Sequence, residues 1–418
     1  MLTKNVTSWL LICLMLSISA CSQNDASGRG PYLQNASSTT MVIRWRSNQD
    51  AQGQVSYGIN SGELTDVAHA AEVSIDQEVL LANLAPDTRY YYKVSGDDTE
   101  YWFRSSPVEG SARPTRVWIL GDAGTADLNA TLVKLAFYDF NGGTTADLML
   151  MLGDNAYDIG TDSNYQNAFF NMYKQSLPGT PVWPALGNHD VDKGELSYFD
   201  MFTLPTDGKT GGVASGTEAY YSFNYANIHF VSLDSELSSL SPAGAMYDWL
   251  ITDLAANTQD WTVVYFHRPP YSKGSHDSDL TNSRMAALRE NFVPVFEMFG
   301  VDLVFTGHSH AYERSYPILG HYGKSDTFLE SMKSDSGDGR LDGDGDYRKA
   351  FGDNSYGAIY TVAGSSGKKG GGALNHAAHY ISMNELGSVV LDFDGAIVDV
   401  TFVSPNPDAV DYYRVTKF

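Results

Sequence analysis

The chain begins its regular pattern with short runs in which apolar and polar residues alternate. These runs are rich in β-branched and aromatic residues, and glycine or asparagine stands between them, as in strands joined by turns. A later run, 84–94, leads through Leu-x-Pro-x-Thr into three consecutive tyrosines. The pattern predicts an all-β domain over residues 30–108, with earlier strands at 41–46, 54–57 and 78–81.

From residue 115 the pattern changes to fully apolar runs that alternate with segments of helical period. Continuous apolar strands between helices are typical of a layered α/β core. A further pair of apolar runs flanks Asp394-Gly395 and predicts a hairpin. We expect an α/β domain over 115–404, followed by a C-terminal tail over 405–418. The strands expected in its core are 116–120, 147–152, 182–186, 228–233, 262–266 and 301–305, and the helices are 130–137, 246–256 and 284–299.

The first 20 residues have the composition of an export signal. Lys4 precedes the apolar run 9–16, and small residues follow that run. The segment ends in Ile-Ser-Ala before Cys21, which resembles a bacterial lipobox, a signal whose cysteine carries lipid after cleavage. We expect a signal peptide at 1–20, a lipid anchor at Cys21, a tether at 21–29 and a place in the cell envelope, at the outer membrane of a Gram-negative bacterium. The alternatives are a plain signal peptide, with a periplasmic or secreted product, and an uncleaved anchor.

Charge and cysteine usage exclude several classes of function. The chain has 50 acidic and 27 basic residues, a formal net charge of −23, which disfavours binding of nucleic acid through its phosphates. Its two cysteines, Cys13 and Cys21, both lie near the start. The body of the protein therefore has no cysteine for a disulfide, a nucleophile or a zinc–thiolate site.

Five short motifs stand at the ends of predicted strands. Because the carboxyl ends of strands in an α/β sheet form one crevice, we expect these motifs to converge. Their carboxylate, amide, phenol and imidazole groups, without cysteine, suit iron, manganese, zinc or similar ions. The motifs are Gly121-Asp122-Ala123-Gly124, Gly153-Asp154-Asn155-Ala156-Tyr157, Gly187-Asn188-His189-Asp190, His267, and Gly307-His308-Ser309-His310.

Together the motifs resemble the calcineurin-like metallophosphoesterases. The tyrosine of Gly-Asp-x-x-Tyr makes the set resemble the purple acid phosphatase branch of that family. The all-β domain in front resembles a fibronectin-III-like sandwich, which fits that branch. The resemblance implies a four-layer α/β fold, with two β-sheets flanked by helices, and two metal ions. It implies Fe(III) at the tyrosine site and Fe, Zn or Mn at the second. The implied ligands are Asp154 as the bridge, Asp122, Tyr157 and His310 at the first site, and Asn188, His267 and His308 at the second.

Two further histidines are candidates for catalysis. His189 resembles the family's histidine that contacts phosphate and protonates the leaving alkoxide; the alternative is that it only orients its loop. His276 lies nine residues after His267, where family members place a substrate histidine, but a surface histidine fits that spacing equally. Asp190 could orient His189 or cap the turn.

The expected function is hydrolysis of small phosphate monoesters by metal-bound hydroxide. A phosphodiesterase or nucleotidase of the same fold is the nearest alternative, because the motifs do not distinguish the leaving groups. A non-catalytic surface binding protein, in which the sandwich binds the partner, is the alternative from another class. The oligomeric state stays open.

Several residues outside the motifs are expected to have structural rather than catalytic roles. His229 is expected to face solvent or to be a satisfied core residue, and Asp234 is not needed for the ligand set. His321 has no partner group, and the loop before His376 could shape a substrate pocket. The acidic segment 335–346 is similar to an EF-hand loop, but Tyr347 replaces the glycine that would follow, so a solvated insertion is favoured.

Overall fold

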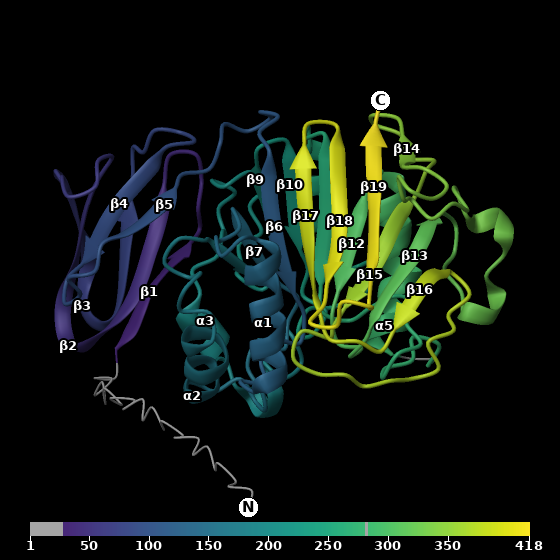
Figure 1. Ribbon diagram of the computed structural model, residues 1–418, viewed down its shortest axis with the longest axis horizontal. Coiled ribbons are helices and arrows are strands. Elements are labelled where there is room, and N and C mark those ends of the chain that lie inside the picture. The colour runs from purple at the N-terminus through teal and green to yellow at the C-terminus, as the bar shows by residue number, and fades with distance from the viewer. Residues whose placement is uncertain (1–27, 281–282) are drawn as a thin grey trace, which may run out of the picture.

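The computed structural model describes residues 28–280 and 283–418. The predicted signal peptide, Cys21 and all but the end of the predicted tether lie outside these residues. The described chain forms an all-β domain, at the left of Figure 1, and a larger α/β domain beside it. Within the described ranges, no helix combines the length and the apolar character needed to cross a membrane.

The N-terminal domain is built around one long strand, β2. This strand pairs with β1 through its first half, with β4 through its end, and with β3 along most of its length. The strands predicted at 41–46 and 54–57 are therefore one strand, bent at irregular pairing between Arg46 and Gln54. Arg29 already lies in β1 and is buried, so the sandwich begins one residue earlier than predicted. The strands are β1 (Arg29–Gln34), β2 (Met41–Gly58), β3 (Asp66–Leu81), β4 (Arg89–Val94) and β5 (Tyr101–Arg104).

The α/β domain contains two seven-stranded sheets, and the bulk of its core lies between them. The first sheet has the order β16 (His379–Met383), β13 (Tyr312–Ile318), β15 (Ala358–Ala363), β12 (Leu303–Thr306), β11 (Trp261–Phe266), β10 (Ile228–Ser232) and β9 (Tyr221–Tyr225). The second has the order β14 (Tyr347–Lys349), β19 (Asp411–Lys417), β18 (Ile397–Val403), β17 (Ser388–Asp394), β6 (Thr115–Leu120), β7 (Leu148–Met151) and β8 (Val182–Pro184).

Side-chain contacts define four layers. Trp261 of the first sheet meets Phe393 of the second edge-on, with ring centroids 5.6 Å apart. On the outer face of the second sheet, Trp118 stacks on Phe137 of α1 at 3.9 Å. On the outer face of the first sheet, Phe266 packs on Phe296 of α6, and buried residues of α4 belong to the same cluster. The predicted fold class, two sheets flanked by helices behind a β-sandwich, is confirmed.

The helices cover the two outer faces. The helix predicted at 284–299 contains a π-helical segment, and Pro294, which lacks a backbone N–H donor, stands just after it. The α-helices are α1 (Leu128–Phe140), α2 (Asp162–Tyr165), α3 (Ser197–Met201), α4 (Ala245–Ala256), α5 (Arg284–Ala287) and α6 (Val293–Met298); the π-helices are η1 (Gln166–Asn171) and η3 (Leu288–Phe292); the 3-10 helices are η2 (Asp192–Gly194), η4 (Ser325–Thr327) and η5 (Glu330–Met332).

The predicted C-terminal tail over 405–418 is wrong. Residues 411–417 form β19, which lies between β14 and β18 in the second sheet. Alternate residues of β19 are buried, and two of them are charged: Asp411 pairs with Arg314 at 2.7 Å, and Lys417 pairs with Asp302 at 2.7 Å. Arg314 lies in β13 of the first sheet and Asp302 directly precedes β12, so ion pairs tie β19 to the first sheet.

Candidate active site

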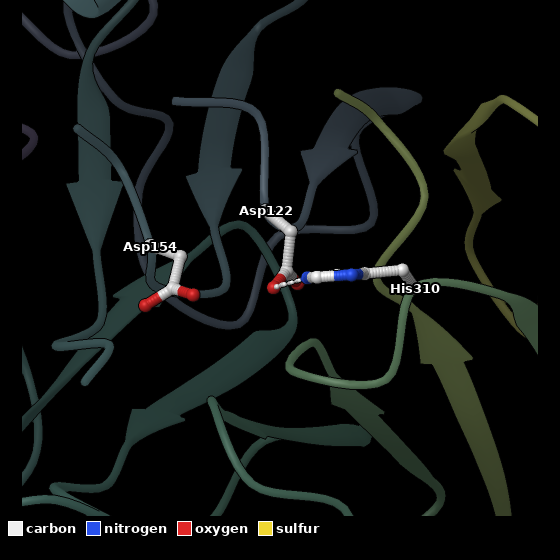
Figure 2. A group of neighbouring side chains, drawn as sticks. All are labelled: Asp122, Asp154 and His310. Atoms are coloured by element: carbon white, nitrogen blue, oxygen red, sulfur yellow. Dashed lines mark ion pairs between the residues drawn. The ribbon is translucent and has the colours of Figure 1, made fainter. Parts of the chain in front are cut away.

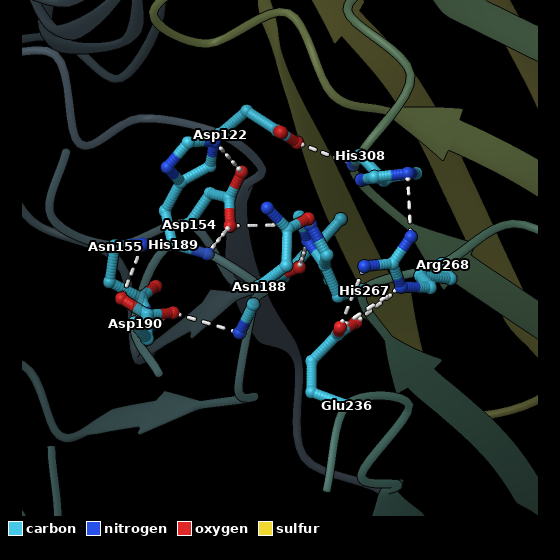
Figure 3. Close-up of polar contacts among 12 residues, drawn as sticks. Asp122, Asp154, Asn155, Asn188, His189, Asp190, Glu236, His267, Arg268 and His308 are labelled. Atoms are coloured by element: carbon cyan, nitrogen blue, oxygen red, sulfur yellow. Dashed lines mark hydrogen bonds and ion pairs between the residues drawn. The ribbon is translucent and has the colours of Figure 1, made fainter. Parts of the chain in front are cut away.

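The predicted motifs follow the carboxyl ends of parallel strands in each sheet. In the second sheet, β6, β7 and β8 are parallel neighbours, and the loops after them carry Asp122, Asp154 and Asn188. In the first sheet, β11 and β12 are parallel neighbours that lead to His267 and His308. Figure 3 shows that these side chains meet, so the site is formed where the carboxyl ends of strands from the two sheets lie close together.

Two motif glycines allow this close approach. A Cβ on Gly153 would lie 2.7 Å from Gly187 Cα and 2.7 Å from His267 Nδ1. A Cβ on Gly187 would overlap the backbone nitrogen of Asp154. Any larger residue would therefore push the loops of the two sheets apart.

Three of the predicted ligands have a strained backbone. Asp122, Asp154 and His308 have φ values of 56°, 52° and 65°, in the left-handed region that non-glycine residues seldom occupy. Each such conformation costs on the order of 1–3 kcal/mol and persists where the surrounding structure fixes it. This strain at three neighbouring positions is what a functional site shows.

The first group of ligand atoms surrounds the hydroxyl of Tyr157. The ligand atoms of Asp122, Asp154 and His310 lie within 4.8 Å of one another (Figure 2). The Tyr157 hydroxyl lies 2.8 Å from Asp154 Oδ2, 3.2 Å from Asp122 Oδ1 and 3.3 Å from His310 Nε2. Within residues 28–280 and 283–418, no other trio of His, Cys, Asp or Glu side chains has this spacing.

The second group lies on the other side of Asp154. His267 Nε2 is 3.1 Å from Asn188 Oδ1 and 3.3 Å from Asp154 Oδ1. His267 Nδ1 lies 2.9 Å from the carbonyl oxygen of Leu152, which accepts the Nδ1 proton, so Nε2 is the ring nitrogen that faces the group. The His308 ring lies 5.0 Å from the His267 ring. All seven predicted metal ligands therefore come together, with Asp154 between the two groups.

The charges of the site favour a cation. Burial and the negative charges of Asp122 and Asp154 raise the pKa of Tyr157 far above its usual range. Burial also raises the pKa of Asp122, but His310 and His267 lower it by more, so the carboxyl stays ionised. Burial, with the positive charges of His267 and Arg268, lowers the pKa of His308 and keeps its imidazole neutral. Carboxylates, a phenol and imidazoles that converge fit hard metal cations.

The two predicted catalytic histidines lie at the rim of this ligand set. His189 Nε2 is 4.0 Å from Asp154 Oδ2, and its ring centroid is 4.4 Å from that of Tyr157. His189 Nδ1 contacts the carbonyl oxygen of Asp158. His276 stacks on His308 with ring centroids 3.9 Å apart and is half-buried, unlike a free surface histidine. Both imidazoles can reach a ligand that sits over the two groups.

Asp190 caps the turn and does not orient His189. It accepts hydrogen bonds from the backbone N–H groups of Asn155 and Gly187 and from the hydroxyl of Tyr165. Burial and the nearby charge of Asp154 raise the pKa of Asp190 to about 7. Its role is to join the Asp154 loop to the Asn188 loop.

The residues expected to have structural roles are mostly as predicted. His229 is a satisfied core residue, bonded to Asp253 at 2.8 Å, and Asp234 accepts three backbone N–H groups of its own loop. His321 has no hydrogen-bond partner on either ring nitrogen among the described residues, as expected, and its ring packs with Tyr271 and His376. His376 is buried in that cluster, whereas Lys368 of the loop before it lies over the Tyr157 ring.

The acidic segment 335–346 folds on its own groups. Asp338 accepts the backbone N–H groups of Arg340 and Asp344, and Arg340 pairs with Asp342. These contacts engage two of the carboxylates that a calcium loop would need for its ion, those of Asp338 and Asp342. They agree with the solvated insertion that the sequence favours.

Two charged residues of the site were missed from the sequence. Arg268 donates to His308 Nε2 at 3.0 Å and pairs with Glu236 at 2.9 Å. Lys368 places its ammonium group 3.5 Å from the centroid of the Tyr157 ring. Only their positions in the sequence could have indicated them. Arg268 directly follows a predicted ligand, and Lys368 lies in the loop after the apolar strand β15.

Comparison with known proteins finds the same two parts. Residues 30–109 match the family model of the purple acid phosphatase N-terminal domain, and residues 115–312 match the model of calcineurin-like phosphoesterases. Purple acid phosphatase 1 of Ipomoea batatas is 28% identical over 316 residues, which cover 70% of this chain and 63% of that protein. Fe(3+)-Zn(2+) purple acid phosphatase 12 of Arabidopsis thaliana is 31% identical over 252 residues, which cover 56% of this chain and 51% of that protein.

A solved structure shows the same fold. The structure of a purple acid phosphatase from yellow lupin (Lupinus luteus) seeds matches with a TM-score of 0.71 and 18% identity, over 93% of this chain and 74% of the lupin chain. The chain thus spans just under two thirds, or less, of the length of the two curated relatives above.

Proposed function

We propose that this chain, a member of the calcineurin-like metallophosphoesterases that carries the purple acid phosphatase N-terminal domain, is a dinuclear metallohydrolase of small phosphate monoesters. The observation that carries the proposal is the convergence of Asp122, Asp154 and His310 around the Tyr157 hydroxyl. A surface binding module has no need for such a donor set.

The ligand set fits two metal ions. Asp122, Asp154, Tyr157 and His310 would hold a trivalent iron, since a phenol whose proton is otherwise firmly held becomes a good ligand only beside a strongly charged cation. Asn188, His267 and His308, with Asp154, would hold a second ion, Fe, Zn or Mn. An Fe(3+)-Zn(2+) relative supports this pairing. Two such ions activate water and polarise a phosphate ester.

The chain's own groups then have distinct tasks. Asp154 presents one oxygen to each ligand group, and the carbonyl oxygen of Leu152 fixes the His267 ring. His189 and His276 stand where they can contact a phosphate and give a proton to the departing alcohol. Arg268 adds a fixed positive charge beside His308 for an anionic substrate.

The experiment is an assay of purified, metal-analysed protein with a chromogenic phosphomonoester and the matching diester. We expect about two metal ions per chain, faster hydrolysis of the monoester, and loss of activity after chelation that added metal restores. Faster hydrolysis of the diester would favour a phosphodiesterase. Metal at full occupancy with no hydrolysis of either ester would favour the surface binding protein.

The cellular place is a separate proposal. The lipobox-like end of the signal segment supports a lipid anchor at Cys21 in the cell envelope, with the outer membrane as its site. One acyl chain gives only marginal membrane binding, so several are expected. Mass spectrometry of the N-terminal peptide from membrane fractions tests this. An unmodified N-terminus at any residue other than Cys21 would contradict it.

A further inference from the structure

The loop between β11 and α5 holds His276 against the metal-ligand set. Residues 272–276 of this loop lie outside helix and strand, yet the His276 ring stacks 3.9 Å from His308. Backbone hydrogen bonds from Ser278 and Leu374 hold the start of this loop, at Ser272 and Lys273. One carboxylate of the neighbouring strand β13 adds side-chain contacts to the same two residues.

Glu313 of β13 uses both of its carboxylate oxygens on this loop. Glu313 Oε1 accepts the backbone N–H of Lys273 at 2.9 Å, and Glu313 Oε2 accepts the hydroxyl of Ser272. Ser272 Oγ in turn accepts the backbone N–H of Gly274 at 3.1 Å. One carboxylate therefore orders three consecutive residues just before His276.

The same network reaches the metal-ligand loop. Ser309, which stands between the predicted ligands His308 and His310, has its Oγ 2.8 Å from Ser272 Oγ. The backbone N–H of His276 donates to Ser309 Oγ at 3.4 Å. Glu313 thus ties the loop that carries His276 to the loop that carries His308.

Glu313 is placed to act as a fixed anchor. It is fully buried, and a Cβ on Gly274 would lie 3.2 Å from its Oε2, so the loop packs directly on the carboxylate. His379 of β16 supports the other side, with Nδ1 3.3 Å from Glu313 Oε1. Burial raises the pKa of Glu313, but His379 and its hydrogen-bond donors lower it by more, so the anchor stays ionised.

We propose that Glu313 is a positioning residue for His276: through Ser272 and Lys273 it fixes the loop so that His276 faces the phosphate of a substrate. This inference rests on the proposed phosphatase function. It assigns Glu313 no contact with substrate or metal. We therefore expect its effect on turnover to pass through His276, with the metal content unchanged.

A double-mutant cycle tests this route. We expect Glu313→Gln to lower kcat/KM for a phosphomonoester roughly tenfold or more, since small misplacements of a catalytic group are costly. In a His276→Ala background the same change should have almost no effect, because the group it positions is gone. Ser272→Ala, which keeps the buried charge, should show a smaller loss with the same dependence on His276 and serves if Glu313→Gln folds poorly.

Glu297→Gln is the matched control. Glu297 is also a buried glutamate that accepts a backbone N–H, from Gly320, but it contacts none of the loop over 272–276. It should leave kcat/KM unchanged in both backgrounds, and metal content should stay constant throughout. Equal losses from Glu313→Gln with and without His276 would overturn the inference, as would an unchanged kcat/KM in His276→Ala. Failure of the proposed function would instead appear as wild-type protein without hydrolysis.

Discussion

Two regions of this molecule bury charged side chains between the same two sheets, and they do so in opposite ways. Along β19, each buried acid has a base beside it: Asp411 pairs with Arg314, and Asp302 contacts Lys349 at 2.8 Å and Lys417 at 2.7 Å. In this cluster, which we call the β19 seam, every buried carboxylate is paired with a lysine or an arginine. The oxygens and nitrogens of the seam point at each other.

At the edge of the sheets the arrangement differs. Asp122 and Asp154 point, with His310 (Figure 2) and the Tyr157 hydroxyl, toward shared space rather than toward a lysine or an arginine. Removing one partner of a buried ion pair destabilises a fold, whereas buried donors that converge without a lysine or arginine favour a cation from outside. The comparison predicts that substitutions in the ligand set lower activity, whereas substitutions in the β19 seam lower stability.

The largest expected effect is at the bridge. Asp154→Asn removes the charge shared by both ligand groups, so we expect it to abolish hydrolysis and metal binding. Because it also removes one of two neighbouring carboxylates, the metal-free variant should unfold at the same or a higher temperature than metal-free wild type. Calorimetry and activity on matched samples check both parts. A marked loss of stability in the metal-free state would place Asp154 with the β19 seam instead.

At the rim of the site, His189→Ala should lower turnover by roughly 10²- to 10⁴-fold, the range for loss of a proton-transfer group. Metal content should stay at the wild-type level, because the ligand set is complete without this ring. Steady-state kinetics with metal analysis on the same preparation measure the effect. If the variant loses its metal, His189 is a ligand and the assignment is wrong.

The β19 seam should respond in the opposite sense. Asp302→Asn leaves Lys349 and Lys417 buried without their counter-charge, and we expect the free energy of unfolding to fall by about 3–5 kcal/mol. Activity per folded molecule should be unchanged. The exposed pair Asp207 and Lys209 gives the control, since Asp207→Asn should cost less than about 1 kcal/mol. Urea unfolding distinguishes the two, and equal costs would contradict the comparison.

The same carboxyl gives an acid sensitivity of defined sign. Burial raises the pKa of Asp302, but Lys349 and Lys417 lower it by more, so folding depresses this pKa. Its stabilising contribution is present above the unfolded pKa of about 3.9 and is lost as the pH falls from there toward the folded pKa. Below about pH 4, wild type should therefore lose stability more steeply than Asp302→Asn. Parallel curves of unfolding free energy against pH would contradict this.

The site could be predicted from the sequence because each of its parts is local. A glycine, a metal-type donor and a preceding apolar run stand within a few residues, and parallel strands bring such ends together. Asp122 and Asn188 could be identified as ligand candidates without knowing which residues they contact. The roles of Arg268 and Glu313 could not be found in this way, because each depends on a side chain from another loop.

The β19 seam could not be predicted for the same reason. Asp411 and Lys417 make residues 411–417 look too polar for an inner strand, and their partners, Arg314 and Asp302, lie about a hundred residues earlier. Only the assembled sheets show that these charges cancel. Long-range charge pairing thus turned a predicted tail into a strand.

The measurement that tests the central claim most directly is the visible spectrum of metal-analysed, iron-containing protein, taken for wild type and Tyr157→Phe. With about two metal ions bound per chain, wild type should be violet to pink, because a phenolate on Fe(III) absorbs visible light. Tyr157→Phe should lose that band while it keeps iron, and Asp302→Asn should keep the band unchanged. A colourless wild type with iron at full occupancy, or a band that survives in Tyr157→Phe, would contradict the account.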